Sequence, residues 1–134
     1  MGRKKLFKQI GILVFSIFIL NYLASKFYLY SAIWYFDMIM HFLGGFWLGL
    51  VSLWFSLPKK LSFSFIFKSL LFVFIVGVAW EVFEIIFYNF LAQSSFDILD
   101  TISDVCFDLA GGAFALLYFF IHIMLISKND VQLP

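Results

Sequence analysis

The sequence has few charged residues and almost no cysteine. Only 13% of its 134 residues are charged, against about 25% in a typical soluble domain, while 64% are apolar, including 21 Phe. A soluble protein of this size could not bury so much apolar surface. Composition therefore excludes a soluble fold and predicts a single membrane domain over residues 1–134. The net charge of +1 argues against a nucleic-acid partner, and the lone Cys106 excludes an internal disulfide.

Four long apolar runs predict four transmembrane helices. They cover about residues 6–24, 31–57, 65–91 and 100–126, and crossing a hydrocarbon core of ~30 Å takes ~20 residues. A membrane-spanning segment must satisfy its own backbone hydrogen bonds, and the alternating pattern of a membrane barrel is missing, so the expected fold class is all-α. The first run follows three basic residues, as in a signal peptide. It has no small-x-small cleavage motif, however, and we expect an uncleaved helix.

The basic residues predict the orientation of this polytopic bundle. Four helices place eight of the nine basic side chains on one side of the membrane and leave only Lys26 on the other. The eight are Arg3, Lys4, Lys5, Lys8, Lys59, Lys60, Lys68 and Lys128. The positive-inside rule then puts both termini in the cytoplasm.

Acidic residues gather in the outer half of the predicted bundle. Seven of the eight lie in or near that half, namely Asp37, Glu81, Glu84, Asp97, Asp100, Asp104 and Asp108. At 1.5 Å of rise per residue, three helices bring acids and His41 to roughly 5–15 Å below the outer interface. Asp37 and His41 share a helix face, as do Asp104 and Asp108, because each pair is four residues apart. Small residues extend these faces and predict close helix packing: Gly44, Gly45, Gly49, Gly77, Gly111 and Gly112.

The depth of these acids calls for a physical explanation. A charged residue deep in a bilayer costs about 2.5–3.5 kcal/mol, and no Lys or Arg is expected at that depth to pair with them. Protonation, a water-filled cavity or a bound cation would each resolve the cost. Carboxylates together with an imidazole suit a divalent ion such as Mn, Fe or Zn.

We therefore predict a metal site with a general base beside it. The expected metal ligands are Asp37, His41, Glu84, Asp104 and Asp108. Glu81, or whichever carboxylate stays free, would act as general base on a bound water. No organic cofactor is expected, and the metal identity stays open.

Several of these residues also have structural explanations when taken singly. Asp37 fits a helix cap or an interfacial position, and His41 fits a hydrogen-bonded core histidine. We expect Asp100 to be the N-cap of the fourth helix and Asp97 to be a loop acid. His122 is expected at the cytoplasmic interface, far from the other residues. The convergence of three helices favours a functional site over these separate explanations.

Three motifs carry a family resemblance. They read Asp37-x3-His41-Phe42-x2-Gly45, then Trp80-Glu81-x2-Glu84, then Asp100-x3-Asp104-x3-Asp108-x2-Gly111. Over residues 34–120 the chain resembles the small bacterial membrane proteins of the YjdF type, and more distantly the VanZ-like family, whose Gln and Arg between the second and third motifs it lacks. The resemblance implies a multi-pass protein of the bacterial cell (inner) membrane with a polar site. It does not name the chemistry.

Three functions remain open at this point. The first is metal-dependent hydrolysis or group transfer on a lipid or lipid-linked substrate of the cell envelope. The second is a proton or cation carrier, which would need a polar path through the inner half of the bundle. The third is a non-catalytic envelope resistance or structural factor. Membrane lipids are the expected partners, and the glycine faces fit either a closed bundle or a pair of chains.

Overall fold

The structure is a computed structural model of the chain. It describes residues 2–58, 60, 62–91 and 97–130, and the side chains among them except those of 88–91 and 123–130. The elements are α1 (Arg3–Lys26), α2 (Leu29–Ala32), α3 (Phe36–Ser56), α4 (Phe63–Leu91) and α5 (Ile98–Asp130).

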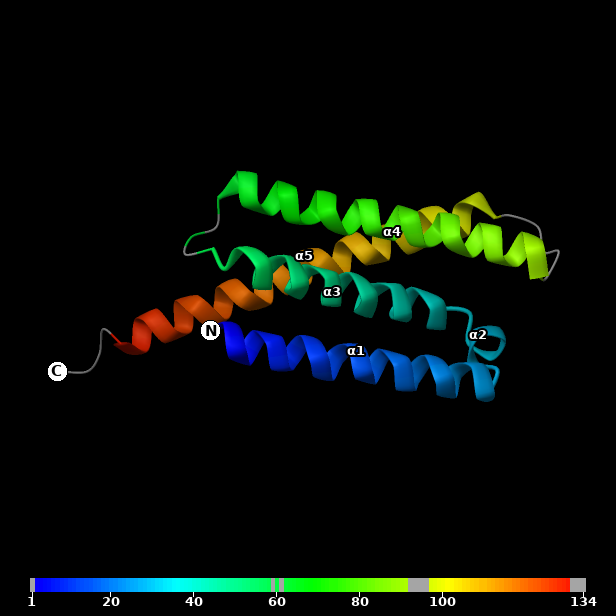
Figure 1. Cartoon of the computed structure of the whole chain (residues 1–134), viewed down its shortest axis with the longest axis horizontal. Helices are drawn as coiled ribbons and strands as arrows, with labels where there is room; N and C mark the ends of the chain where they lie inside the picture. The colour runs from blue at the N-terminus through cyan, green and yellow to red at the C-terminus, as the bar shows by residue number, and fades with distance from the viewer. Residues whose placement is uncertain (1, 59, 61, 92–96, 131–134) are drawn as a thin grey trace.

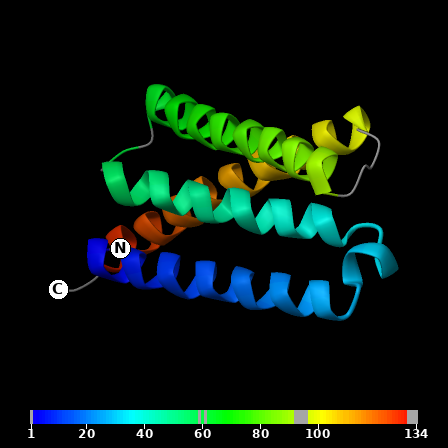
Figure 2. The same cartoon turned by 45° about the vertical axis from the view of Figure 1, so that its right-hand side comes forward.

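Four of these helices are long and apolar enough to cross a membrane. The candidate spans are Arg3–Lys26, Phe36–Ser56, Phe63–Phe87 and Ile98–His122, and the described residues contain no strand. The all-α, multi-pass membrane architecture is thus confirmed; that the whole chain is one domain stays a prediction. In Figures 1 and 2, α1, α3 and α4 lie side by side and α5 crosses obliquely behind them. The start of α1 and the end of α5 lie at one end of the bundle, as an even number of spans requires (Figure 1).

The second apolar run is interrupted near its start. Instead of one helix over 31–57, the short α2 is followed by a break, and α3 begins at Phe36. Ile33 is extended (φ −125°, ψ 100°) at the end of α2, a conformation that suits its β-branched side chain. Trp34 in the break is 78% exposed. Hydropathy alone does not mark such a break, because aromatic and β-branched residues are apolar whether or not they continue a helix. As a result, Asp37 lies in the first turn of α3.

The N-cap of α5 is Asp97 and not Asp100. The backbone N–H of Leu99 donates to the Asp97 carboxylate (2.9 Å), and that of Thr101 donates to the Asp97 carbonyl (3.2 Å). The expectation that Asp97 is a loop acid and Asp100 the cap is therefore wrong. The helix starts two residues earlier than the apolar run suggested, and Asp100 lies exposed in its first turn.

The closest helix contact joins α3 to α5 through glycine. α5 packs more extensively on α3 than any other two elements pack on each other. A Cβ added at Gly45 would overlap the backbone carbonyl of Asp108, and one added at Gly111 would overlap the carbonyl of Phe42. The predicted glycine faces do bring these backbones together, as small residues do in membrane bundles.

The half of the bundle nearer the termini has an apolar core. Its buried hydrophobic cluster comes from α1, α3 and α5: Leu6, Leu50, Leu53, Ala115, Leu116 and Phe119. Polar contacts there are few. The Ser52 hydroxyl donates to Ser69 Oγ (2.8 Å) between α3 and α4, and the Gln9 amide donates to the Tyr118 hydroxyl (3.0 Å). The polar side chains deep in the other half therefore stand out against an apolar surrounding.

Candidate functional site

Three helices bring His41, Glu81 and Asp104 to one level of the bundle. His41 lies five residues into α3, about 8 Å from its start, and Asp104 lies six residues into α5, about 9 Å from its start. Glu81 lies ten residues before Leu91, the end of α4, about 15 Å away. The contacts of His41 with Glu81 and Asp104 bring the three helices together at one level, while the depth of this level below the membrane interface stays a prediction.

These residues form a buried cluster around His41. We use the name "carboxylate cluster" for the six side chains Asp37, His41, Glu81, Glu84, Asp104 and Asp108. Four of them are almost fully buried, with exposed fractions of 6% for His41, 5% for Glu81, 2% for Asp104 and 5% for Asp108. The Asp37 side chain is 39% exposed, and Glu84 is half-buried. The cluster is thus deepest on α5 and most accessible at Asp37 and Glu84.

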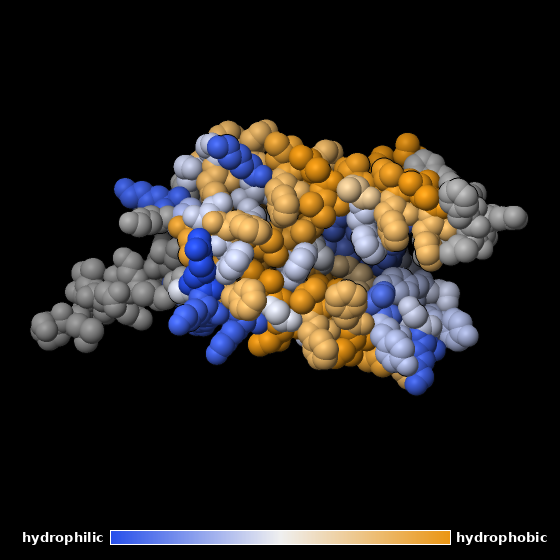
Figure 3. All heavy atoms as spheres, viewed as in Figure 1, coloured by the Kyte–Doolittle hydropathy of each residue, from blue (hydrophilic) through white to orange (hydrophobic). Residues whose placement is uncertain are grey.

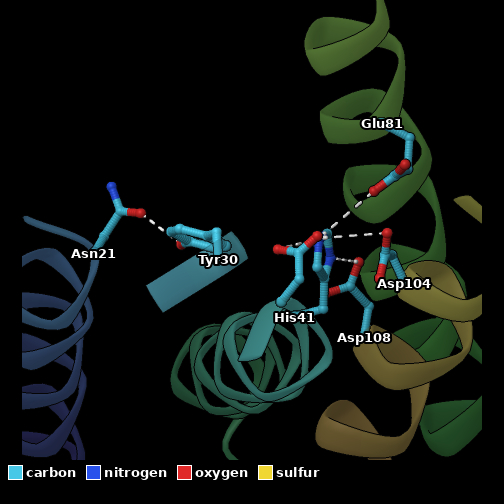
Figure 4. A network of polar contacts seen from close by, with 7 residues as sticks. Asn21, Tyr30, His41, Glu81, Asp104 and Asp108 are labelled. Atoms are coloured by element: carbon cyan, nitrogen blue, oxygen red, sulfur yellow. Dashed lines mark hydrogen bonds and ion pairs between the residues drawn. The ribbon is translucent and has the colours of Figure 1, made fainter. Parts of the chain in front are cut away.

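The two ring nitrogens of His41 face different carboxylates. Nε2 lies 3.9 Å from Asp37 Oδ1, 3.7 Å from Glu81 Oε1 and 3.9 Å from Asp104 Oδ2. Nδ1 lies 3.4 Å from Asp108 Oδ2. Figure 4 shows the ring between these groups, with Glu81 contributed by α4 and both Asp104 and Asp108 by α5. One imidazole therefore connects carboxylates from three helices.

The charge of this cluster is not balanced by the protein. Within the described part of the chain, the ion pairs of these acids are all with His41, and none involves Lys or Arg. A single imidazolium can neutralise only one of the four carboxylates around it. In addition, Glu81 Oε1 and Asp104 Oδ1 are buried and accept no hydrogen bond. Each such orphan acceptor costs about 1–3 kcal/mol, so the arrangement calls for protons or a bound cation.

Glycines leave room for the Asp108 side chain between the helices. A Cβ added at Gly77 of α4 would lie 2.6 Å from Asp108 Oδ2, and one added at Gly44 would lie 3.8 Å from Asp108 Oδ1. The Asp108 carboxylate thus occupies the space that a side chain at Gly77 would need. The expectation that Gly77 allows close packing is confirmed, and the group it admits is a carboxylate from α5.

Two overlapping sets of side chains have the spacing of a metal site. They are Asp37 with His41 and Asp104, and His41 with Glu81 and Glu84; within each set the ligand atoms lie within 4.8 Å of one another. Two ligands at about 2.1 Å from one ion lie roughly 3.0–3.4 Å apart. The distances of 3.7–3.9 Å from His41 Nε2 to its carboxylates would have to contract only slightly. Among the described residues, Asp108 belongs to neither set.

The predicted site residues come together, and two other acids and one histidine lie apart. Asp97 and Asp100 are exposed at the start of α5. His122 lies about 21 Å along α5 from Asp108, and its ring stacks on Tyr118 (6.3 Å between centroids). The different surroundings of the two His41 nitrogens could not be predicted from the sequence, because the spacing of residues along one helix does not determine contacts between helices.

A family comparison agrees with the membrane setting. The model of a family described as "Predicted membrane protein (DUF2238)" matches residues 3–124, which include the four candidate spans and the whole carboxylate cluster. The YjdF-type proteins belong to this same family, whereas the VanZ-like resemblance stays a prediction. No curated protein and no solved structure matches the chain.

Proposed function

The chain belongs to the DUF2238 family of predicted membrane proteins, and we propose that it is a membrane metalloprotein whose carboxylate cluster binds a divalent cation. One observation carries the proposal. His41 Nε2 is surrounded within 4 Å by carboxylates from α3, α4 and α5, and two of these carboxylates have a buried oxygen with no hydrogen-bond donor. A cation held by Asp104 would offset the unbalanced charge, and a water bound to that cation would supply a donor for Glu81 Oε1.

The ligand chemistry narrows the choice of ion. Asp37, His41 Nε2 and Asp104 would hold it, with Glu84 completing the coordination from α4. An imidazole among carboxylates suits Mn, Fe or Zn, whereas Mg and Ca prefer oxygen ligands alone. Glu81 is the proposed general base, because its orphan Oε1 lies 3.7 Å from Nε2 and so within reach of a water bound to the ion.

We propose that the reaction is metal-assisted hydrolysis or group transfer on a membrane lipid or lipid-linked substrate. His41 and Asp104 lie about 8–9 Å from the starts of α3 and α5, where the polar part of a lipid can reach them. Figure 3 shows hydrophilic atoms set in a hollow right of centre, below α4, with hydrophobic residues around it and further hydrophilic residues toward both ends of the face. The more accessible members of the carboxylate cluster, Asp37 and Glu84, would meet the substrate first. A bound ion makes water a nucleophile at neutral pH.

The apolar inner half argues against a proton or cation carrier. An ion that passed between α3 and α5 would meet the buried side chains of Leu50, Leu53, Leu116 and Phe119, which offer no ligand. The polar groups of that half are few, among them Ser52 and Ser69 between α3 and α4. A non-catalytic envelope factor is the remaining alternative, and no feature of the described residues favours it. It corresponds to one outcome of the experiments below, namely metal binding without turnover.

Metal analysis of the purified protein tests the binding step. The protein in mild detergent is stripped with EDTA, reloaded with Mn²⁺, Fe²⁺ or Zn²⁺, and measured by elemental analysis and thermal unfolding. We expect bound metal and a stabilisation of about 2.7 kcal/mol at one hundred times the Kd. His41→Ala and Asp104→Asn should lose both effects, while His122→Ala is the matched histidine control and should keep them. Equal behaviour of the two histidine variants, or no metal at all, would rule the site out.

A second experiment separates catalysis from binding. The metal-loaded protein is incubated with a membrane-lipid extract and the products are followed by mass spectrometry. Glu81→Gln should keep the metal and lose turnover, because it removes the base but not the proposed ligands. If the native protein binds metal and converts no lipid, the enzyme proposal is wrong and the non-catalytic alternative takes its place.

A further inference from the structure

We infer that Asp108 is a positioning residue and not a metal ligand: it keeps the proton of neutral His41 on Nδ1 and so leaves the Nε2 lone pair for the cation. The metal part of this inference rests on the proposed function. The location of the proton on the imidazole does not, and it can be measured without metal.

The contacts of the two nitrogens are the first support. A neutral imidazole carries one proton, and the nitrogen that donates it is set by the acceptor nearby. Asp108 Oδ2 lies 3.4 Å from Nδ1, the shortest of the four contacts between the ring and a carboxylate. The other three contacts, at 3.7–3.9 Å, are all to Nε2. The nitrogen that faces one carboxylate is thus the donor, and the nitrogen that faces three is the ligand.

The placement of Asp108 is the second support. It lies four residues deeper along α5 than Asp104, about 6 Å closer to the middle of the bundle. Its backbone carbonyl lies against Gly45 of α3 and its Oδ2 lies against Gly77 of α4. The two glycines thus leave space for the Asp108 backbone and carboxylate next to α3 and α4. An acceptor behind a metal-binding histidine is the usual way in which proteins fix the tautomer of the ring.

The consequence is a difference in role between two acids of one helix face. Asp104 places Oδ2 3.9 Å from Nε2, and its other oxygen, Oδ1, is buried without a hydrogen bond, whereas Asp108 approaches the opposite nitrogen. Loss of Asp104 removes a ligand. Loss of Asp108 leaves every ligand in place and lowers metal affinity by about 10–100-fold, as the loss of such supporting partners does.

Nitrogen NMR of the protein measures the proton directly. The chain has two histidines, so His122→Ala leaves His41 as the only histidine signal after ¹⁵N-histidine labelling. Spectra of the metal-free protein are recorded over a pH series up to the alkaline end, where the ring is neutral. We expect the proton to remain on Nδ1. In Asp108→Asn we expect mixed or reversed protonation, because the amide NH₂ can donate to Nδ1; in Asp104→Asn we expect no change.

Metal affinity of the same variants completes the test. A 10–100-fold loss in Asp108→Asn together with altered protonation supports a positioning role. Two results would overturn it: a neutral ring protonated on Nε2, or complete loss of binding in Asp108→Asn with unchanged protonation, which would make Asp108 a ligand. If His41 is protonated on Nδ1 but no metal binds, the proposed function fails while the assignment of the hydrogen bond stands.

Discussion

Replacing Gly45 with alanine tests whether the close contact of α3 and α5 builds the site. The added Cβ would overlap the backbone carbonyl of Asp108. A backbone atom cannot rotate away as a side chain can, so the two helices must separate or slide. Gly44→Ala is the matched control in the same helix, because its Cβ would meet Asp108 Oδ1 at 3.8 Å, an ordinary contact.

The difference between these two variants can be estimated. Overpacking a tight contact costs about 1–3 kcal/mol, and a gap of even 0.5–1 Å forfeits roughly a quarter to a half of the dispersion energy of the atoms along it. Alanine also favours the helix over glycine by about 1 kcal/mol, but this gain is common to both variants and cancels. We expect Gly45→Ala to be less stable than Gly44→Ala by about 3 kcal/mol.

Unfolding in mixed detergent and SDS micelles measures this difference. The four tryptophans of the chain provide a fluorescence signal, and metal affinity is measured on the same samples. Gly45→Ala should also weaken metal binding, because a shift of α5 moves Asp104 and Asp108 relative to His41. Equal stability and affinity of the two variants would refute the packing described here.

Three further predictions concern the cap of α5, a pair of serine hydroxyls and the pH dependence of metal binding. Asp97→Ala should lower the free energy of unfolding by about 1 kcal/mol, because the Leu99 N–H loses its cap acceptor, and hydrogen exchange should rise at the start of α5. Asp100→Asn should change stability little. A larger loss of stability in Asp100→Asn than in Asp97→Ala would show that Asp100 is the cap. For the part-buried Ser52–Ser69 pair, a double-alanine cycle should give a coupling of about 0.6 kcal/mol in SDS unfolding, and additive single effects would mean that no hydrogen bond forms. Finally, calorimetry should show metal affinity falling as pH falls from neutral, because protons compete for the carboxylate oxygens; a flat profile would exclude carboxylate ligands.

The helices could be predicted from the sequence because the bilayer imposes a length and requires internal backbone hydrogen bonds. The runs 65–91 and 100–126 match α4 and α5 to within a few residues. The break before Phe36 and the cap at Asp97 could not be predicted in this way. Both depend on local backbone geometry, and an apolar residue such as Ile33 gives the same hydropathy in an extended segment as in a helix.

The site could be predicted as a group of residues but not in its internal arrangement. Depth follows from helix length and rise, so Glu81, Asp104 and His41 were expected at one level. Which ring nitrogen meets which acid depends on the rotation and crossing of the helices. That rotation is set at Gly45 and Gly77, where the neighbouring backbone or carboxylate fills the space of the missing side chain. Spacing along one helix contains no information about such contacts between helices.

The contact between α3 and α5 also has a consequence for biogenesis. These two helices are separated in the chain by α4, so the glycine face of α3 enters the membrane before its partner has been made. Synthesis of the residues from the end of α4 to the end of α5 takes roughly 2–8 s at ribosomal speed. During that interval His41 and Glu81 are in the membrane without Asp104 and Asp108. A nascent or truncated chain that ends before α5 therefore lacks the Asp104 and Asp108 carboxylates that face His41 in the complete bundle.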